Sequence, residues 1–337
     1  MKFGRILRDS PDGKIARLVV VEPEKGRVID LARAAALHYV ATRNATTDAA
    51  RAFANAAYPG SMALALSMGN YLTDHTPGIV ASTGDDASLD MNEVEWLPAS
   101  DPPVLRDGLN FLGHITGWSA KMGRTVPDAM ERVVPYCQNS PAMVIGNNAT
   151  VPWPGYINHM DYELELGWVI GRKVKNLTPE NALDAVFGVT MYNDFSGRDL
   201  QQDEVAIGMG GTKAKNFAHG IGPWITTMDE FKDPYSIEME VRLNGETKGK
   251  GVSSDVLWRV EEVLSFVSQG EYLQPGEVIG SGTLEKGSAL EHGIKLKPGD
   301  VVELEAKNIG ILRNVLGEPE QGMWWPTAQP GKLVPTS

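Results

Sequence analysis

The sequence contains a single cysteine, Cys137. One cysteine can form neither an intrachain disulfide nor a thiolate zinc cluster. The N-terminus lacks the apolar stretch of a secretory signal. The longest apolar stretch, residues 61–72, is too short to cross a bilayer and is interrupted by Gly69 and Asn70. These absences predict a soluble, cytoplasmic protein that has no membrane partner.

Basic residues are also scarce. Lysine and arginine number 31 against 43 aspartates and glutamates, which gives a net charge of −12 over 337 residues. Nucleic acids and anionic membranes bind clustered basic surfaces, so this balance argues against both as partners. Hydrophobic residues make up 42% and charged residues 22%, as in ordinary globular proteins, so extensive disorder is excluded. Most of the acids must lie on the surface, and the question is whether a few do not.

The length predicts two domains, or one large domain with an appended smaller one. Strand-like runs and alanine-rich helical runs alternate near the N-terminus, at residues 14–21, 27–31, 32–42 and 46–57. The sequence Asp101-Pro102-Pro103 bars a helix and forces extended backbone, as in a linker. We therefore predict a small N-terminal α/β domain at residues 1–100 and a larger, mainly β domain at residues 101–337.

Strands dominate the second part. We expect them at residues 142–145, 162–170, 187–192, 237–243, 278–281, 301–306 and 310–315, with helices at 179–186 and 255–268. Asn244-Gly245 is typical of a type I′ hairpin turn. The 36 glycines and 21 prolines agree with a β-rich body that has many turns.

Three acids alternate with apolar residues in the sequence DYELEL at residues 161–166. In a strand, this period places Asp161, Glu163 and Glu165 on one face. A half-exposed strand with a wet acidic face is the simpler interpretation. However, no basic residue separates the acids, and the segment continues into the apolar sequence GWVIG. Buried carboxylates must be paired or bind a metal, and such ligands favour Mg²⁺, Mn²⁺ or Ca²⁺.

Two further residues leave a structural and a chemical interpretation open. Asp194 ends an apolar strand, where it could bind a metal or serve as a turn or N-cap residue, and Ser196 after it is expected to cap a helix. His114 lies in a mildly apolar segment that follows Arg106-Asp107. A lone histidine in such a segment is more often structural than catalytic.

Five segments in order along the chain carry a family resemblance. DYELELGWVIG (161–171), MYNDFSGRDLQ (191–201) and AKNFAHGIGPW (214–224) resemble the core signature of the fumarylacetoacetate hydrolase superfamily. RDGLNFLGH (106–114) is similar to its metal-aspartate and catalytic-histidine segment, and GSGTLEKGSALE (280–291) to its substrate-threonine and dyad-glutamate segment. The similarity extends over most of residues 101–317, and the first hundred residues match only loosely.

The resemblance implies a mixed β-roll fold and a divalent-metal site. It assigns the metal to Asp107, Glu163, Glu165 and Asp194, with Mg²⁺ first and Mn²⁺ or Ca²⁺ as alternatives. It makes His114 the general base and Glu291 the carboxylate that orients it. The groups implied to contact the substrate or its oxyanion are Lys215 (with Lys213 as a rival), Arg198, Gln201, Thr283 and Tyr136.

The implied activity is metal-dependent hydrolysis of a carbon–carbon bond in a 1,3-diketone acid, which gives a 2-oxo acid and a carboxylate. Leu109 and Gly117 depart from the family pattern, and Leu109 argues against fumarylacetoacetate itself as the substrate. The alternatives are an isomerase, a 2-oxo acid decarboxylase or a hydratase/dehydratase of the same superfamily, and a non-catalytic member that binds a metal or ligand. The resemblance also implies a homodimer, a small keto-acid partner and, by default, a role in aromatic catabolism.

Overall fold

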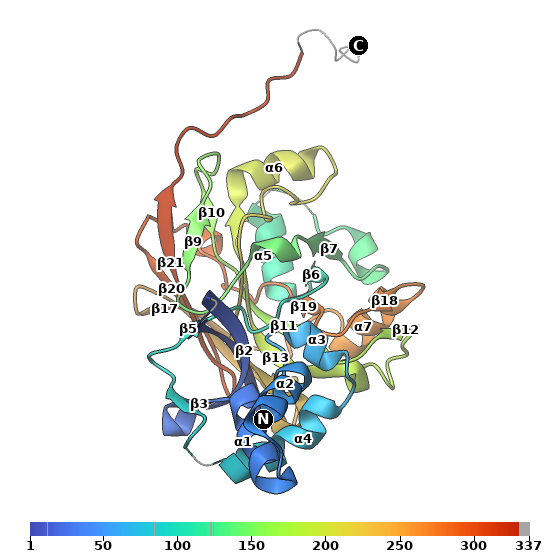
Figure 1. Ribbon diagram of the computed structural model, residues 1–337. Helices are drawn as coiled ribbons and strands as arrows, with labels where there is room; N and C mark the ends of the chain where they lie inside the picture. The colour runs from blue at the N-terminus through green and yellow to red at the C-terminus, as the bar shows by residue number, and fades with distance from the viewer. Residues whose placement is uncertain (12, 84, 122, 124, 330–337) are drawn as a thin grey trace.

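A computed structural model describes residues 1–11, 13–83, 85–121, 123 and 125–329 (Figure 1). The last eight residues of the predicted domain 101–337 therefore lie outside the described residues. Among the described residues, no helix has both the length and the apolar character needed to cross a membrane.

The N-terminal residues form a curved set of strands covered by helices. The strands are β1 (Lys2–Ser10), β2 (Gly13–Glu22), β3 (Arg27–Asp30), β4 (Ser88–Asp90) and β5 (Glu95–Trp96), and the helices are α1 (Leu31–Arg43), α2 (Thr47–Ala57), α3 (Met62–Leu66) and α4 (Tyr71–Thr83). Asp30 caps α1 by accepting a hydrogen bond from Arg33 N at 3.1 Å. The strands and helices expected before residue 60 form within about two residues of their predicted bounds, whereas β1 was not predicted.

One large sheet runs through both predicted domains. Its strand order is β4-β3-β2-β1-β15-β13-β11-β19-β6-β7, with β5 beside β1 and β8 beside β15. The additional strands are β6 (Leu105–Gly108), β7 (Tyr136–Asn139), β8 (Val144–Ile145), β11 (Leu164–Ile170), β13 (Val186–Asp194), β15 (His219–Thr227) and β19 (Val278–Gly280). β1 pairs antiparallel with β15, so the first strand of the chain extends the sheet that carries the later motifs. The division near residue 100 stays a prediction.

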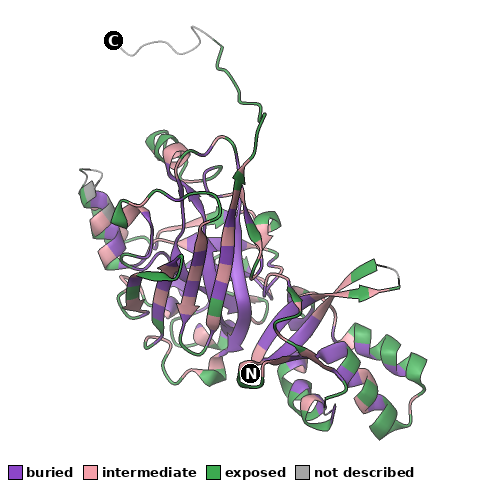
Figure 2. Ribbon diagram, turned by 90° about the vertical axis from the view of Figure 1, so that its left-hand side faces the viewer, coloured by how far each residue is buried: buried purple, intermediate pink, exposed green. Residues whose placement is uncertain are grey.

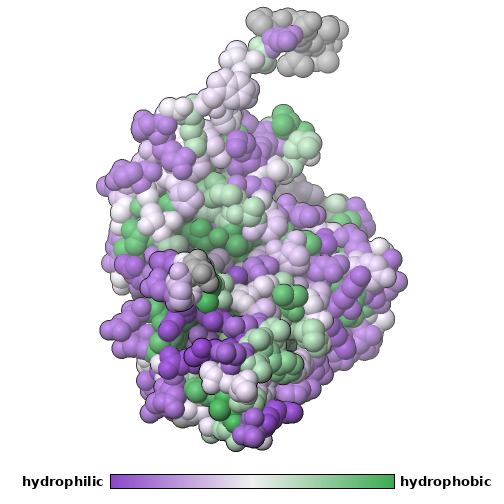
Figure 3. All heavy atoms as spheres, viewed as in Figure 1, coloured by the Kyte–Doolittle hydropathy of each residue, from purple (hydrophilic) through white to green (hydrophobic). Residues whose placement is uncertain are grey.

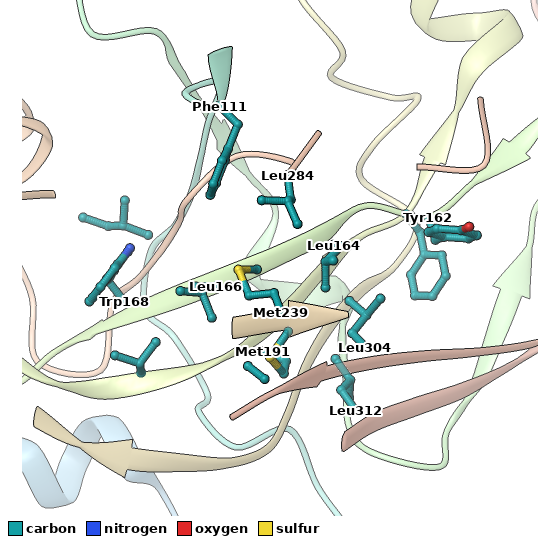
Figure 4. Packing of buried hydrophobic residues seen from close by; sticks show 14 of the residues in the cluster. Phe111, Tyr162, Leu164, Leu166, Trp168, Met191, Met239, Leu284, Leu304 and Leu312 are labelled. Carbon is teal, nitrogen blue, oxygen red and sulfur yellow. The ribbon is translucent and has the colours of Figure 1, made fainter. Parts of the chain in front are cut away.

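A second sheet packs against this one. Its order is β17 (Glu246–Val252), β16 (Glu238–Leu243), β20 (Val301–Ala306), β21 (Gly310–Pro319) and β9 (Thr150–Trp153). Along β16 and β20, buried residues alternate with more exposed ones, as expected where one face of a sheet covers a core. Figure 2 shows the strands coloured by burial, with buried residues concentrated along them. Leu166 and Met191 of the large sheet meet Met239, Leu304 and Leu312 of the second sheet (Figure 4). The predicted mainly β fold with an α/β N-terminal part is confirmed.

The remaining helices are α5 (Leu112–Lys121), α6 (Arg198–Ala206) and α7 (Val260–Ser268), and short strand pairs join β10 (Met160–Asp161) to β14 (Ser196–Gly197) and β12 (Val174–Lys175) to β18 (Tyr272–Leu273). The predicted helix at residues 179–186 does not form, because only a 3-10 turn, Leu183–Ala185, precedes β13. The helix predicted from residue 255 begins at Val260, where the Glu262 carboxylate accepts a hydrogen bond from Arg259 N at 2.8 Å. The strand predicted at 142–145 is shortened to Val144–Ile145, because Pro141 starts a 3-10 turn.

Candidate active site

A cavity of about 250 Å³ opens between α6, α5 and the β6–β7 hairpin. Of the eleven residues predicted for the site, eight line this cavity: Asp107, His114, Tyr136, Glu163, Arg198, Gln201, Lys215 and Thr283. The other three, Glu165, Asp194 and Glu291, lie behind this lining, and their contacts are given below. Residues that are separated by up to 176 positions in the sequence therefore meet at one place.

Three buried carboxylates cluster at the cavity and are called its floor, although only two of them, Asp107 and Glu163, line it. Asp107, Glu163 and Glu165 each offer an oxygen that lies within 4.8 Å of the others. Asp107 comes from β6, and Glu165 comes from β11, with β19 between these two strands. Gly280 of β19 is the register partner of Asp107, and a Cβ atom there would come within 2.6 Å of Asp107 Oδ1. A glycine at this position leaves room for the aspartate.

Asp107 and Glu165 are held in an environment that disfavours their charge. Burial, followed by the charge of Glu165, raises the pKa of Asp107 well above its usual range. Burial, followed by the charge of Glu163, likewise raises the pKa of Glu165. Glu165 accepts hydrogen bonds from Gly282 N at 2.8 Å and Thr283 Oγ1 at 3.3 Å. Asp107 Oδ1 has no hydrogen-bond partner among the described residues.

Lys215 supplies positive charge on the other side of the floor. Its Nζ atom contacts Glu163 Oε2 and Asp194 Oδ2. Burial alone would raise the pKa of Asp194, but Lys215 together with His219 and Asp107 outweighs burial and holds that pKa below the ordinary value. Lys215 and Arg198 have the same effect on the pKa of Glu163, and the acids around Lys215 raise the pKa of its ammonium group.

The buried side chains of Arg198 and Asp161 form hydrogen bonds that fix the position of Glu163. Arg198 Nε donates to Asp161 Oδ2 at 2.7 Å, and Arg198 Nη2 donates to Glu163 Oε1 at 2.8 Å. Asp161 Oδ1 accepts from Ala289 N at 2.7 Å. The alternating acids therefore have different roles, because Asp161 pairs with Arg198 whereas Glu163 and Glu165 join Asp107.

Ser196 does not cap α6 as predicted. Gly197 occupies the N-cap position, and no side chain caps the helix there. Ser196 Oγ instead donates to the carbonyl oxygen of Asp194 at 3.0 Å. Residues 196–197 pair as β14 with β10, and this pairing delays the start of the helix.

His114 and Glu291 form a pair at the wall of the cavity. His114 Nδ1 lies 3.1 Å from Glu291 Oε2, and both side chains are almost fully buried. Burial alone would raise the pKa of Glu291, but the contact with His114 lowers it to about 2. The carboxylate also accepts from Ser288 Oγ at 2.9 Å and Lys286 N at 3.0 Å. With Nδ1 turned to Glu291, Nε2 is the ring nitrogen left for a reactant.

The two candidate lysines are clearly separated in space. Lys213 has its ammonium group 4.7 Å above the ring of Tyr156 and does not line the cavity. Tyr136 lies on β7 under the guanidinium of Arg106, at 5.6 Å from the ring centroid. The geometry therefore places Lys215 and Tyr136, but not Lys213, in the cavity.

The cluster fits a divalent cation. Its five carboxylates, Asp107, Asp161, Glu163, Glu165 and Asp194, are accompanied by two permanent cations, Lys215 and Arg198, which leaves a formal charge of −3 if all the acids ionise. A dication would reduce this to −1. The unpartnered Oδ1 atom of Asp107 and the all-oxygen donor set agree with a hard ion.

The match to known proteins covers the part of the chain that forms this site. The model of the fumarylacetoacetate (FAA) hydrolase C-terminal domain matches residues 103–316. The chain belongs to the fumarylacetoacetate hydrolase family. Within the family, an uncharacterised protein of Archaeoglobus fulgidus is 34% identical over 233 residues, which cover 68% of this chain and 85% of that protein.

Solved structures of the family extend the likeness to the N-terminal part. The fumarylacetoacetate hydrolase of Exiguobacterium antarcticum is 26% identical, with a TM-score of 0.68 over 94% of this chain and 99% of that chain. A maleylpyruvate hydrolase from Sphingobium sp. SYK-6, solved with manganese(II) and pyruvate, is 19% identical, with a TM-score of 0.67 over 95% and 100% of the two chains. A 2-hydroxyhepta-2,4-diene-1,7-dioate isomerase from Mycobacterium marinum is 22% identical, with a TM-score of 0.64 over 94% and 98%. The last two show the shared fold alone. Taken together, the comparisons support an enzyme of this family.

Proposed function

We propose that this protein is a divalent-metal-dependent hydrolase that cleaves a carbon–carbon bond in a 1,3-diketone acid such as an acylpyruvate. The observation that carries the proposal is a three-carboxylate floor in the same cavity as a His–Glu pair. The floor supplies ligands for a hard cation, and the pair supplies a base for water. The family contains both hydrolases and isomerases, and the His114–Glu291 pair favours hydrolysis over isomerisation because hydrolysis needs an activated water and isomerisation does not.

Asp107, Glu163, Glu165 and Asp194 would hold the cation, with Mg²⁺ as the proposed ion. Bound there, a divalent cation supplies Lewis-acid polarisation of carbonyl oxygens. Asp161 and Arg198 fix the orientation of Glu163, while Gly282 N and Thr283 Oγ1 fix that of Glu165. A preorganised ligand set of this kind needs little rearrangement when the ion binds.

His114 would take the proton of the attacking water at Nε2. Glu291 holds the Nδ1–H tautomer and stabilises the imidazolium that forms, as a carboxylate does in other acid–base pairs. The low pKa of Glu291, about 2, keeps it ionised throughout this exchange. The central CH₂ carbon of the leaving group would then take this proton from His114.

Polar side chains that line the cavity would bind the 2-oxo acid end of the substrate. Gln201 and Thr283 are among them, and Arg198 Nη1 donates to Gln201 Oε1 at 2.9 Å. Lys215 would stabilise the oxyanion formed when the hydroxyl adds to the distal carbonyl carbon. Val205 on α6 and Leu109, directly after β6, would give the cavity an apolar wall for the acyl group.

The reaction balances without another reactant. Water adds its oxygen to the distal carbonyl carbon, the bond from this carbon to the central CH₂ breaks, and the CH₂ carbon takes the proton held by His114. An acylpyruvate plus water therefore yields one carboxylate and one pyruvate. No oxidant or reductant is needed.

We also propose a homodimer in the cytoplasm that acts on a small keto acid. Apolar side chains gather in patches on an otherwise hydrophilic surface (Figure 3). The large exposed ones include Leu64, Met68, Ile207, Met209 and Trp324. Contiguous exposed apolar surface is where a partner subunit would bind.

The test is a panel of acylpyruvates and fumarylpyruvate-like acids, given to the protein with Mg²⁺ and with a chelator. We expect loss of the diketone-enol absorbance together with one equivalent of 2-oxo acid, in the Mg²⁺ sample only. Glu163→Gln should lose the activity, whereas Glu246→Gln, a change at an exposed acid, should keep it. Full activity in chelator would refute the proposal, and a spectral change without cleavage products would favour an isomerase.

A further inference from the structure

A buried histidine that the mechanism does not use lies directly behind Asp194. His219 on β15 is the antiparallel register partner of Asp194 on β13, and its side chain is fully buried. His219 Nδ1 lies 2.9 Å from Asp194 Oδ1. Its pairing with Asp194 depends on a strand register that the sequence alone does not reveal.

Tyr192 and Asn139 complete a polar chain around the same oxygen. Tyr192 precedes Asp194 by two residues on β13, so both side chains lie on one face of the strand. The Tyr192 hydroxyl lies 3.0 Å from His219 Nδ1 and donates to Asp194 Oδ1 at 3.3 Å. Asn139 Nδ2 donates to the Tyr192 hydroxyl at 3.1 Å. The Tyr192 and His219 rings also stack, with 6.0 Å between centroids and 19° between planes.

This arrangement gives the two oxygens of Asp194 different surroundings. Oδ1 faces His219 and Tyr192, which both belong to the protein interior. Oδ2 faces the floor of the cavity, where it contacts Lys215 Nζ. A carboxylate with one oxygen committed to the protein can turn only the other oxygen to a ligand.

We infer that His219 is a positioning residue that, with Tyr192, holds Asp194 so that Oδ2 alone is presented to the cation site. The inference rests on the metal site of the proposed function. Groups of this kind behind metal ligands typically change metal affinity by about 10–100-fold when they are removed. Asp194 without its partners can rotate away from the cavity or turn both oxygens toward Lys215.

Binding of Mn²⁺ alone to the metal-free protein tests the inference without turnover. Free Mn²⁺ is counted by its electron paramagnetic resonance signal. His219→Leu removes the donor and should weaken Mn²⁺ binding by about 10–100-fold. His219→Asn keeps a donor near the position of Nδ1 and should restore binding to within about threefold of the unaltered protein.

Thr226→Val is the matched control. Thr226 lies on the same strand, is equally buried and donates to Asn308 O at 3.0 Å, away from the acids. This change should lower the melting temperature without altering Mn²⁺ binding. Tyr192→Phe, which removes one hydroxyl, is a second test variant if His219→Leu does not fold. We expect it also to weaken Mn²⁺ binding.

The outcomes separate the two proposals. If the unaltered protein does not bind Mn²⁺, the metal site itself is refuted. If it binds Mn²⁺ and the His219→Leu protein binds equally tightly, the positioning role is refuted and the metal site stands. Equal weakening by His219→Asn, His219→Leu and Thr226→Val would also refute the role, because the effect would then follow stability alone.

Discussion

Replacing Asp107 by asparagine should stabilise the metal-free protein and at the same time remove its response to metal. The carboxyl of Asp107 is buried, its Oδ1 atom has no partner among the described residues, and Glu165 lies beside it. An amide of the same shape carries no charge and offers a donor to the neighbouring carboxylates. The substitution therefore relieves repulsion but takes away a ligand.

The magnitude follows from the separation of the charges. Two like charges within the 4.8 Å of this cluster repel by about 3.5 kcal/mol at an effective dielectric constant of about 20. A proton shared between the acids relieves part of this repulsion, so we expect a gain of about 1–3 kcal/mol. For 337 residues the entropy of unfolding is about 0.7 kcal/mol/K, so the melting temperature should rise by about 1–4 °C.

Added metal should stabilise the unaltered protein but not the Asp107→Asn protein. At a concentration 100 times its dissociation constant, Mg²⁺ stabilises the unaltered protein by about 2.7 kcal/mol, which corresponds to about 4 °C. The Asp107→Asn protein should show little or no shift. Differential scanning calorimetry measures the melting temperature of each protein with chelator and with Mg²⁺. Asp86→Asn, at an exposed acid, is the control.

The stability difference between the Asp107→Asn protein and the unaltered protein should depend on pH. The folded-state pKa of Asp107 lies above its ordinary value of 3.8, so this group costs stability as the pH rises from about 3.8, where the unfolded chain ionises, toward the raised folded-state pKa. The advantage of Asp107→Asn should therefore vanish below about pH 3.8 and grow toward neutral pH. A variant that is less stable than the unaltered protein without metal, or that keeps the full Mg²⁺ shift, would refute the reasoning.

Three further predictions concern the wall of the cavity. His114→Asn should lower kcat for hydrolysis by about 10²–10⁴-fold, with little change in circular dichroism; a smaller loss would show that another group activates water. Glu291, whose pKa is lowered to about 2 from 4.5, contributes stability that is complete above pH 4.5 and is lost as the pH falls toward 2, so Glu291→Gln should flatten this part of an acid-unfolding curve. Leu109→Arg should shift kcat/KM from acylpyruvates with an apolar tail toward those that end in a carboxylate, because it adds a cation to the apolar wall; an unchanged preference would place the tail elsewhere.

The sequence was informative where a local pattern and an ordered set of motifs agreed. Alternation in residues 161–166 predicts that Glu163 and Glu165 share a face, and both do reach the buried cluster. The same alternation places Asp161 with them, but β10 ends at Asp161 and β11 begins at Leu164, so the strand is interrupted. Burial of all the acids depends on β19, α6 and the residues around Ala289, which come from distant parts of the chain.

The features that the sequence did not predict depend on long-range pairing. β1 was missed because its run contains Arg5 and Arg8, yet it becomes an interior strand through its pairing with β15 and β2. Residues 179–186 have helical propensity, but the requirement that β13 start at Val186 leaves room for a single turn. A local pattern does not report the register of strands that are far apart in the chain.

The arrangement of charge in the floor explains how such an acidic site can exist before a metal arrives. Glu163 and Asp194, which contact Lys215, have lowered pKa values, whereas Asp107 and Glu165, which do not contact it, have raised ones. The metal-free cluster therefore favours ionisation of the two acids beside the internal ammonium group and disfavours it for the other two. Carboxylates bind a cation in their ionised form, so metal binding should strengthen as the pH rises. The surplus of acids in the sequence thus includes a few residues whose charge state is set by the ligand rather than by solvent.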